Sequence, residues 1–316
     1  MKGSWTERQL DVNGLSMRMV EQGQGPAVVL CHGFPELWYS WRHQIPALAE
    51  AGFRVIVPDQ RGYGRTTAPP RVEDHTMENL TADMLALLEV LELKQAVFVG
   101  HDWGGAVVWS MALHYPERVR AVAGINTPFL ERGALNPAWI QRGTKWDYQI
   151  YFNEVGRAEE ELSRNVRRVF TLMFRTSKPA DGGGDAVGLT ATVTQRGGLL
   201  VGLPEDAPRS IMLTQEDLDF FVSEYERTGF RGGLNWYRNL PANWQWGERV
   251  AGKQVLQPAL MVTPGKDGVL TPDMADGMER WVPNLRRAHI EQCGHWTQQE
   301  EPEQLNRILL DWLRSL

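Results

Sequence analysis

Short apolar runs alternate with stretches of helical periodicity along the first 130 residues of the chain. Continuous apolar and β-branched runs of roughly four to eight residues are typical of strands in a parallel sheet that is covered on both faces. We therefore expect buried strands at residues 27–31, 53–57, 96–99 and 119–125, with helices at residues 81–91 and 106–114.

Residues 8–20 follow a different pattern, in which apolar and polar positions alternate. Asn13-Gly14 interrupts this alternation, and Asn-Gly is the preferred pair for the type I′ turn of a β-hairpin. The sequence therefore predicts a hairpin ahead of the first buried strand.

The alternation of strands and helices stops near residue 130. Residues 131–245 contain no clear strand, and their polar periodicity predicts helices at residues 157–174 and 214–228. Residues 177–208 include Gly182-Gly183-Gly184 and Gly197-Gly198, which favours a mobile loop, and such a loop gates a pocket in many enzymes.

The strand–helix pattern resumes after residue 246, with strands at 259–263 and 287–291 and helices at 273–281 and 303–313. The chain thus divides into the first part of an α/β core at residues 1–130, a helical cap at residues 131–245, and the second part of the core at residues 246–316. Strand–helix alternation of this kind predicts a mostly parallel sheet.

Composition limits the classes of partner. The 316 residues carry a formal net charge of −6, and no basic block suits a nucleic acid or an anionic membrane. No apolar run is long enough to span a bilayer, and the first ten residues lack the apolar stretch of a signal peptide. Cys31 and Cys293 are too few for a disulfide framework and lack metal-ligand spacing, so we expect free thiols, no metal and a cytoplasmic location.

Candidate chemistry lies where the strands end, because sites in parallel sheets form at the carboxyl ends of strands. The segment GHDWG at residues 100–104 has the pattern of a nucleophile elbow, with Asp102 in the position usually held by serine. Asp267 follows a later strand and His295 follows the last one. The order nucleophile, acid, histidine is that of the α/β-hydrolases.

Each of these residues also has an ordinary structural explanation. Asp102 precedes a helix and could be its N-cap, Asp267 precedes a glycine as in many turns, and His295 could be a loop histidine. The joint occurrence of all three in this order favours the catalytic interpretation.

An aspartate at the elbow changes the reaction. A carboxylate is already ionised at neutral pH and can attack an sp³ carbon directly, which leaves an alkyl ester on Asp102. His295, oriented by Asp267, would then deprotonate the water that cleaves the ester. The backbone N–H groups of Phe34 and Trp103 are candidates for the oxyanion hole.

Two kinds of leaving group suit such a nucleophile. An epoxide opens to a basic alkoxide and needs an acid, for which tyrosine is suited because it stays protonated at neutral pH. A halide is a weak base and needs only N–H donors, such as the indole of Trp103.

The chain resembles the epoxide hydrolases of the α/β-hydrolase superfamily, in particular the C-terminal hydrolase domain of mammalian soluble epoxide hydrolase and its bacterial relatives. The resemblance covers residues 20 to 315. It rests on the segments CHGFPE (31–36), GHDWGG (100–105), WDYQIYF (146–152), GFRGGLNWYR (229–238), KD (266–267) and CGHW (293–296).

The resemblance implies an α/β-hydrolase fold, which is a mostly parallel eight-stranded sheet with helices on both faces and an inserted helical cap. It also implies that Tyr148 and Tyr237 polarise the epoxide oxygen, without a cofactor. Both could instead be packing residues of the cap, and Tyr151 is the neighbour most easily mistaken for Tyr148. The mammalian proteins carry a further phosphatase domain, whereas this chain starts at the hydrolase, so we expect no phosphatase activity and no Mg²⁺ site.

Alternatives stay open. Haloalkane dehalogenases share the Asp-Trp pair but commonly have Asn where Phe34 stands, and ligand receptors of the same fold often lack one of the catalytic residues.

Trp38, Trp103 and Phe34 are expected to line the pocket. Glu36 and His101 could position the hydrolytic water or could support the loop and backbone around the nucleophile. The expected partner is a small epoxide, and the chain is expected to be a monomer or homodimer.

Overall fold

The computed structural model describes residues 5–133, 135–182 and 186–316. Gly183 and Gly184 of the predicted glycine-rich loop lie outside the described residues. Cys31 and Cys293 are both buried free thiols, as predicted.

One eight-stranded sheet forms the centre of the molecule, with the order β1-β2-β4-β3-β5-β6-β7-β8. β2 pairs antiparallel with β1 and β4, and the remaining neighbours are parallel, which confirms the mostly parallel sheet. Asn13 and Gly14 have φ of 48° and 74°, the signs that a type I′ turn requires. The strands are β1 (Thr6–Val12), β2 (Leu15–Gln22), β3 (Ala27–Cys31), β4 (Arg54–Pro58), β5 (Ala96–His101), β6 (Val119–Ile125), β7 (Ala259–Pro264) and β8 (Leu285–Ile290).

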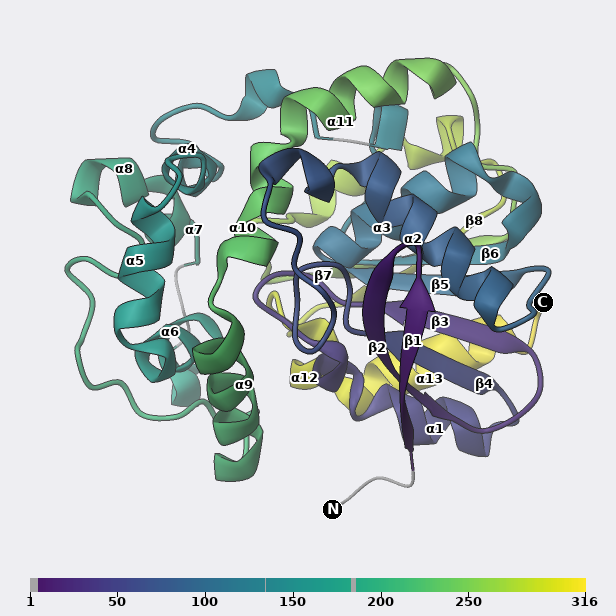
Figure 1. Ribbon diagram of the computed structural model, residues 1–316, viewed down its shortest axis with the longest axis horizontal. Helices are drawn as coiled ribbons and strands as arrows, with labels where there is room; N and C mark the ends of the chain where they lie inside the picture. Colours follow the sequence, from purple (N-terminus) through teal and green to yellow (C-terminus); the bar gives the residue numbers. More distant parts are fainter. Residues whose placement is uncertain (1–4, 134, 183–185) are drawn as a thin grey trace.

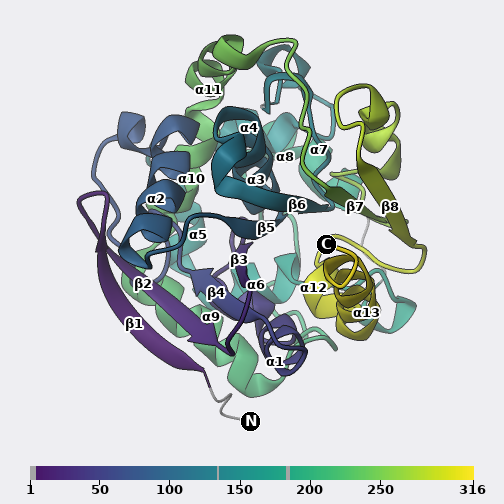
Figure 2. The same ribbon diagram turned by 90° about the vertical axis from the view of Figure 1, so that its right-hand side faces the viewer.

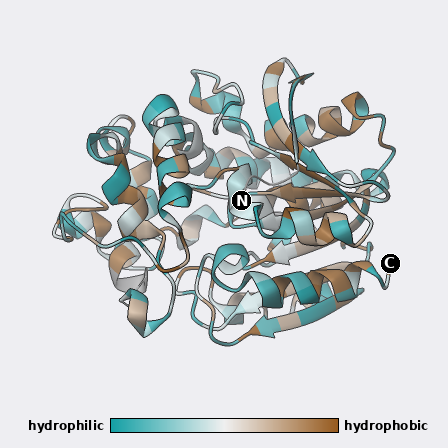
Figure 3. Cartoon of the chain, turned by 90° about the horizontal axis from the view of Figure 1, so that it is seen from below, coloured by the Kyte–Doolittle hydropathy of each residue, from teal (hydrophilic) through white to brown (hydrophobic). Residues whose placement is uncertain are grey.

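Both faces of the sheet are covered by helices (Figure 2). α1 (Gln44–Glu50) and α13 (Pro302–Leu313) pack on one face, and α2 (Met77–Val90) and α3 (Trp103–His114) pack on the other. Alternate residues of the central strands β3, β5, β6 and β7 contribute to the two apolar clusters, because successive side chains of a strand point to opposite faces. The central strands are accordingly hydrophobic along most of their length (Figure 3).

Between β6 and β7 in the sequence the chain forms a helical insertion, here called the cap, and most of its helices lie to the left of the sheet in Figure 1. Among its described residues there is no strand, as the sequence predicts. None of the described helices of the chain is both long and apolar enough to cross a membrane. The cap helices are α4 (Asp147–Phe152), α5 (Arg157–Arg164), α6 (Val166–Met173), α7 (Ala186–Ala191), α8 (Val193–Arg196), α9 (Gln215–Thr228), α10 (Arg231–Arg238) and α11 (Leu240–Trp246).

Three predicted elements differ from the structure. The helix expected at residues 157–174 is divided at Asn165, whose Oδ1 accepts a hydrogen bond from the Arg168 N–H and starts a new helix. The loop expected at residues 177–208 contains α7 and α8. The helix expected at residues 273–281 is two 3₁₀ turns separated at Gly277, whose φ of 73° a continuous helix cannot contain.

The cap helix α10 lies directly against the core. The Trp236 indole donates a hydrogen bond to the Arg61 carbonyl at 3.1 Å. A Cβ atom added to Gly232 would overlap the backbone carbonyl of Gly62, so glycine is required for this close approach. This contact determines how far α10 stands from the carboxyl ends of the strands.

We expect Gly232→Ala to lower the free energy of unfolding by about 2 kcal/mol, since overpacking a tight contact costs about 1–3 kcal/mol. Chemical denaturation of the variant and the parent protein measures the difference. Ser223→Ala places the same side chain at an exposed position of α9 and serves as the control. Equal stability of Gly232→Ala and the parent would show that α10 can move away from Gly62 without loss.

Candidate active site

Asp102 occupies a sharp turn between β5 and α3. Its backbone φ of 51° and ψ of −123° lie outside the regions that residues other than glycine ordinarily adopt. Cβ atoms at Gly100 or Gly104 would overlap the backbone of the turn or of β3. The glycines therefore allow the turn to close, and the predicted elbow is present in the backbone.

The Asp102 carboxylate lies beside both backbone groups predicted for an oxyanion hole. The Phe34 N–H donates to Asp102 Oδ1 at 2.8 Å, and the Trp103 N–H is also hydrogen-bonded to this carboxylate. The Thr127 hydroxyl donates to the Asp102 carbonyl at 2.7 Å and holds the turn from the end of β6. Both N–H groups are thus aimed at the atoms of one carboxylate.

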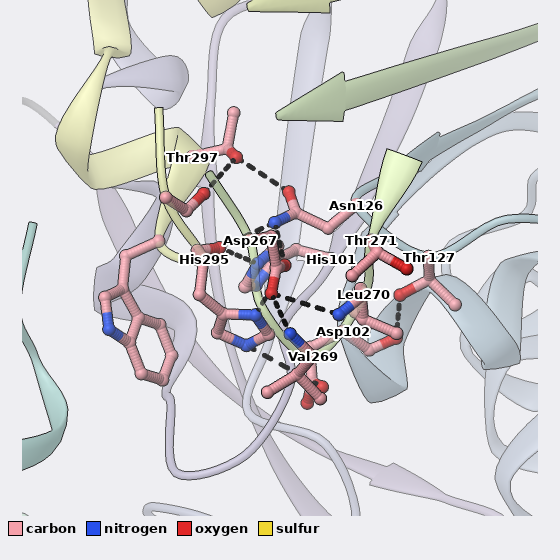
Figure 4. A network of polar contacts seen from close by, with 12 residues as sticks. His101, Asp102, Asn126, Thr127, Asp267, Val269, Leu270, Thr271, His295 and Thr297 are labelled. Carbon is pink, nitrogen blue, oxygen red and sulfur yellow. Dashed lines mark hydrogen bonds and ion pairs between the residues drawn. The ribbon is translucent and has the colours of Figure 1, made fainter. Parts of the chain in front are cut away.

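His295 lies between two carboxylates from different strand ends (Figure 4). Its Nδ1 is 2.8 Å from Asp267 Oδ2, and its Nε2 is 3.9 Å from Asp102 Oδ2. Asp267 Oδ1 accepts the backbone N–H groups of Val269 and Leu270 at 2.9 and 3.0 Å. The structure therefore brings together the three residues that sequence order selected.

Burial and charge act against each other at these groups. Burial alone would lower the pKa of His295, but the Asp267 carboxylate, with a smaller effect of Asp102 and Glu36, raises it to about 9. Burial raises the pKa of Asp102, although His295, His101 and the two N–H donors oppose the shift. Burial would also raise the pKa of Asp267, but His295 and the donors around it hold that pKa well below its usual range.

Asn126 is a site residue that the sequence interpretation missed. It follows β6 with a φ of 63°, and its Nδ2 donates to Asp267 Oδ2 at 2.7 Å and to the His295 carbonyl at 2.9 Å. The Thr297 hydroxyl in turn donates to Asn126 Oδ1. Its position after a predicted strand was a signal that could have drawn attention to it.

Two buried tyrosines reach the site from the cap. Tyr148 lies on α4 and Tyr237 on α10, and their rings meet edge to face with centroids 5.8 Å apart. The Gln149 amide donates to the Tyr148 hydroxyl at 3.1 Å, and the Trp103 side chain hydrogen-bonds Tyr237. Burial raises the pKa of both phenols, so both remain protonated at neutral pH. Tyr151 points elsewhere, with its hydroxyl 2.9 Å from Glu161.

Two cavities meet at these residues. The first has an empty volume of about 710 Å³ and a mainly apolar lining that includes Trp103, and the second has about 980 Å³ and is lined by Phe34 and His295 among others. The residues shared by both linings are Asp102, Tyr148, Tyr237 and Val269. A molecule in either cavity therefore reaches the same carboxylate and the same two phenols.

Comparisons with known proteins agree with this geometry. A family model described as the alpha/beta hydrolase fold matches residues 26–302. Bifunctional epoxide hydrolase 2 of Sus scrofa is 52% identical over 305 residues, which cover 96% of this chain and 54% of that protein. Epoxide hydrolase A of Mycobacterium tuberculosis is 41% identical over 320 residues, which cover 99% of both chains.

The chain belongs to the epoxide hydrolases of the α/β-hydrolase fold family. The crystal structure of Epoxide Hydrolase A from Mycobacterium thermoresistibile matches with a TM-score of 0.87 and 40% sequence identity over 98% of each chain. The chain spans about half the length of the mammalian relative and nearly all of the mycobacterial ones.

Glu36 and His101 lie behind the site and line neither cavity. His101 Nδ1 is 2.7 Å from Glu36 Oε2, and His101 Nε2 is 2.7 Å from the His295 carbonyl. Glu36 also accepts the Gly33 N–H at 2.9 Å. The pair is fully buried, and its contacts are those expected of the second role considered above, support of the loop and backbone around the nucleophile, while positioning of the hydrolytic water stays a prediction.

The prediction that Trp38 lines the pocket is wrong. Trp38 belongs to a 3₁₀ turn, Trp38–Trp41, and to the apolar cluster on the face of the sheet that α1 and α13 cover. Its indole packs against Trp5, Phe220 and the Arg18 guanidinium, and it borders neither cavity. Among the residues that the structure describes, no group of three or more His, Cys, Asp and Glu side chains is arranged to hold a metal ion.

We expect Asp102→Asn to lower the pKa of His295 from about 9, because the substitution removes a negative charge that favours the imidazolium. NMR titration of the His295 ring measures the change. Glu279→Gln removes a carboxylate that is more than half exposed and bonded to Arg287, and serves as the control. An unchanged titration in Asp102→Asn would mean that the other carboxylates, Asp267 above all, set the protonation of His295.

Proposed function

We propose that the protein hydrolyses epoxides to vicinal diols through a covalent ester on Asp102. The observation that carries this proposal is the pair of buried, protonated phenols, Tyr148 and Tyr237, that border the same cavities as the Asp102 carboxylate. An acid beside a carboxylate nucleophile is what the opening of an epoxide requires.

In the first step, Asp102 attacks one carbon of the epoxide and the bond from that carbon to the ring oxygen breaks. Asp102 Oδ1 is held by the Phe34 N–H, so Oδ2 is the oxygen available for attack. Tyr148 and Tyr237 hydrogen-bond the ring oxygen, and one of them donates its proton as the alkoxide forms. The products of this step are an ester, a new hydroxyl group and a tyrosinate.

In the second step, His295 removes a proton from water, and the resulting hydroxide attacks Cγ of the Asp102 ester. The N–H groups of Phe34 and Trp103 stabilise the oxyanion, as their contacts with the carboxylate suggest. Collapse of this intermediate releases the diol and restores the carboxylate. The proton that His295 took from water returns to the tyrosinate, which restores the phenol used in the first step.

Charge links the two steps. The Asp102 carboxylate is one of the groups that raise the pKa of His295 to about 9. Esterification removes that charge, so the pKa of His295 falls and a neutral imidazole becomes easier to form. Formation of the Asp102 ester in the first step therefore also makes His295 available as the base that the second step needs.

Two features disfavour a halide as the leaving group. Phe34 offers a backbone N–H but no side-chain donor, and the Trp103 side chain is already hydrogen-bonded to Tyr237.

We also propose that the substrate is a small epoxide. We propose a cytoplasmic location, which the buried free thiols of Cys31 and Cys293 support. A monomeric or homodimeric state stays a prediction.

Product analysis with styrene oxide and 1-bromobutane tests the proposed function. We expect diol from the epoxide and no free bromide, and we expect Tyr148→Phe/Tyr237→Phe to lose diol formation because no acid remains for the alkoxide. Tyr151→Phe removes a hydroxyl of the same cap region outside the cavities and is the matched control. Bromide without diol would instead identify a dehalogenase, and neither product from folded protein would favour a ligand receptor.

We expect His295→Gln to accumulate the ester, because the first step does not use the imidazole. Intact-protein mass spectrometry after acid quenching should then show an increase equal to the mass of the epoxide. Asp102→Asn, treated in the same way, should show no increase. Normal steady-state turnover by His295→Gln would contradict the assigned base.

A further inference from the structure

A single buried turn joins distant parts of the molecule. The helix α12 (Thr297–Glu300) follows the His295 loop, and all four of its side chains are buried. Thr297 bonds Asn126, Gln298 bonds Glu36, Gln299 bonds Arg42 and Glu300 bonds Ser177. Only the last of these is a direct bond to the cap.

Glu300 connects the cap with the loop that carries His295. Its Oε1 accepts the Ser177 N–H at 2.8 Å and the Ser177 hydroxyl at 2.6 Å. Its Oε2 accepts the N–H of Gly294, the residue before His295, at 2.8 Å. One buried carboxylate thus ties two backbone segments that belong to different parts of the chain.

The residue after His295 reaches the same segment of the cap. The Trp296 indole donates to the Met173 carbonyl at 2.8 Å, and its ring packs on Phe174 with centroids 4.4 Å apart. Gly294 and Trp296 are therefore both bonded to residues 173–177, one through Glu300 and one directly. Asp102, in contrast, is bonded to Phe34 and Thr127, which both belong to the core.

This segment also forms part of the wall of the second cavity. Met173, Thr176 and Ser177 line it together with His295. Asp181 braces the segment from the cap side, because it accepts the Thr176 N–H at 2.7 Å and pairs with Arg175 at 3.0 Å. The wall beside the substrate and the loop of the base are consequently parts of one hydrogen-bonded unit.

We propose that Glu300 is a positioning residue that makes the placement of His295 depend on the cap segment 173–177. The proposal rests on the proposed function, in which His295 activates water. The Asp267 bond orients the imidazole from one side, and Glu300 restrains the backbone that carries it. Displacement of the segment from the core withdraws this restraint.

The effect should be specific to one step. Ester formation uses Asp102, Tyr148 and Tyr237, and Glu300 contacts none of them. Ester hydrolysis needs the His295 imidazole within reach of a water molecule, and a displacement of roughly 1 Å costs about 100-fold in such reactions. Loss of the restraint therefore slows the second step and leaves the first unchanged.

The test compares Glu300→Gln with Glu301→Gln in the full chain. Glutamine keeps the shape of Glu300 but turns one acceptor into a donor that faces a backbone or hydroxyl donor. Glu301 is the adjacent residue and pairs with Lys178 of the cap at 2.8 Å, without a bond to the His295 loop. Rapid acid quenching and intact-protein mass spectrometry with styrene oxide measure ester formation and ester decay separately.

We expect Glu300→Gln to slow ester decay by about 10- to 100-fold, with ester formation within twofold of the parent and Glu301→Gln unchanged in both steps. Equal slowing of both steps, or no change in either, would overturn the proposal. Should Glu300→Gln fail to fold, Ser177→Ala, which removes one of the three bonds, must show a smaller loss in the same step. Absence of any ester in His295→Gln would instead contradict the proposed function.

Discussion

The backbone conformation of Asp102 is the constraint on which the rest of the site depends. A backbone φ of 51° is unfavourable by about 1–3 kcal/mol for a residue other than glycine, and such a conformation persists only where the surrounding structure holds it. Here the parallel pairing of β3 with β5 and the hydroxyl of Thr127 hold it. The same pairing sets the Phe34 N–H against the carboxylate, so the nucleophile and its donors have one structural origin.

Around this turn the protein keeps several charges out of water. Asp267, Glu36 and Asp102 are each in contact with or close to an imidazole, either His295 or His101. Burial of an unpaired charge is very unfavourable, so these groups are retained in pairs that also accept backbone and amide donors. The Glu36–His101 and Asp267–His295 pairs are connected, because His101 is hydrogen-bonded to the carbonyl of His295.

Core and cap make different contributions. The core supplies the carboxylate, the histidine and the backbone donors from the ends of its strands, and the cap supplies the phenols. Gly232 sets the distance of α10 from the core, and α12 carries bonds from the core to the cap beside His295. Buried backbone contacts and hydrogen bonds, as well as apolar packing, therefore hold the cap in place on the core.

The sequence by itself determined the strands, the elbow and the order of Asp102, Asp267 and His295, because periodicity and turn chemistry are local and strand ends meet at one edge of a parallel sheet. Motif resemblance pointed to Tyr148 and Tyr237, for which the chain has no local signal.

Only the tertiary structure decided which neighbours of these motifs face the cavities. Trp38 and Glu36 lie within a few residues of Phe34, yet one packs against the opposite face of the sheet and the other is buried beneath the loop. Asn126 bonds Asp267 and Glu300 bonds Ser177, and each of these partners is more than one hundred residues away in the chain. Such contacts depend on how separate elements pack, which no local pattern of residues specifies.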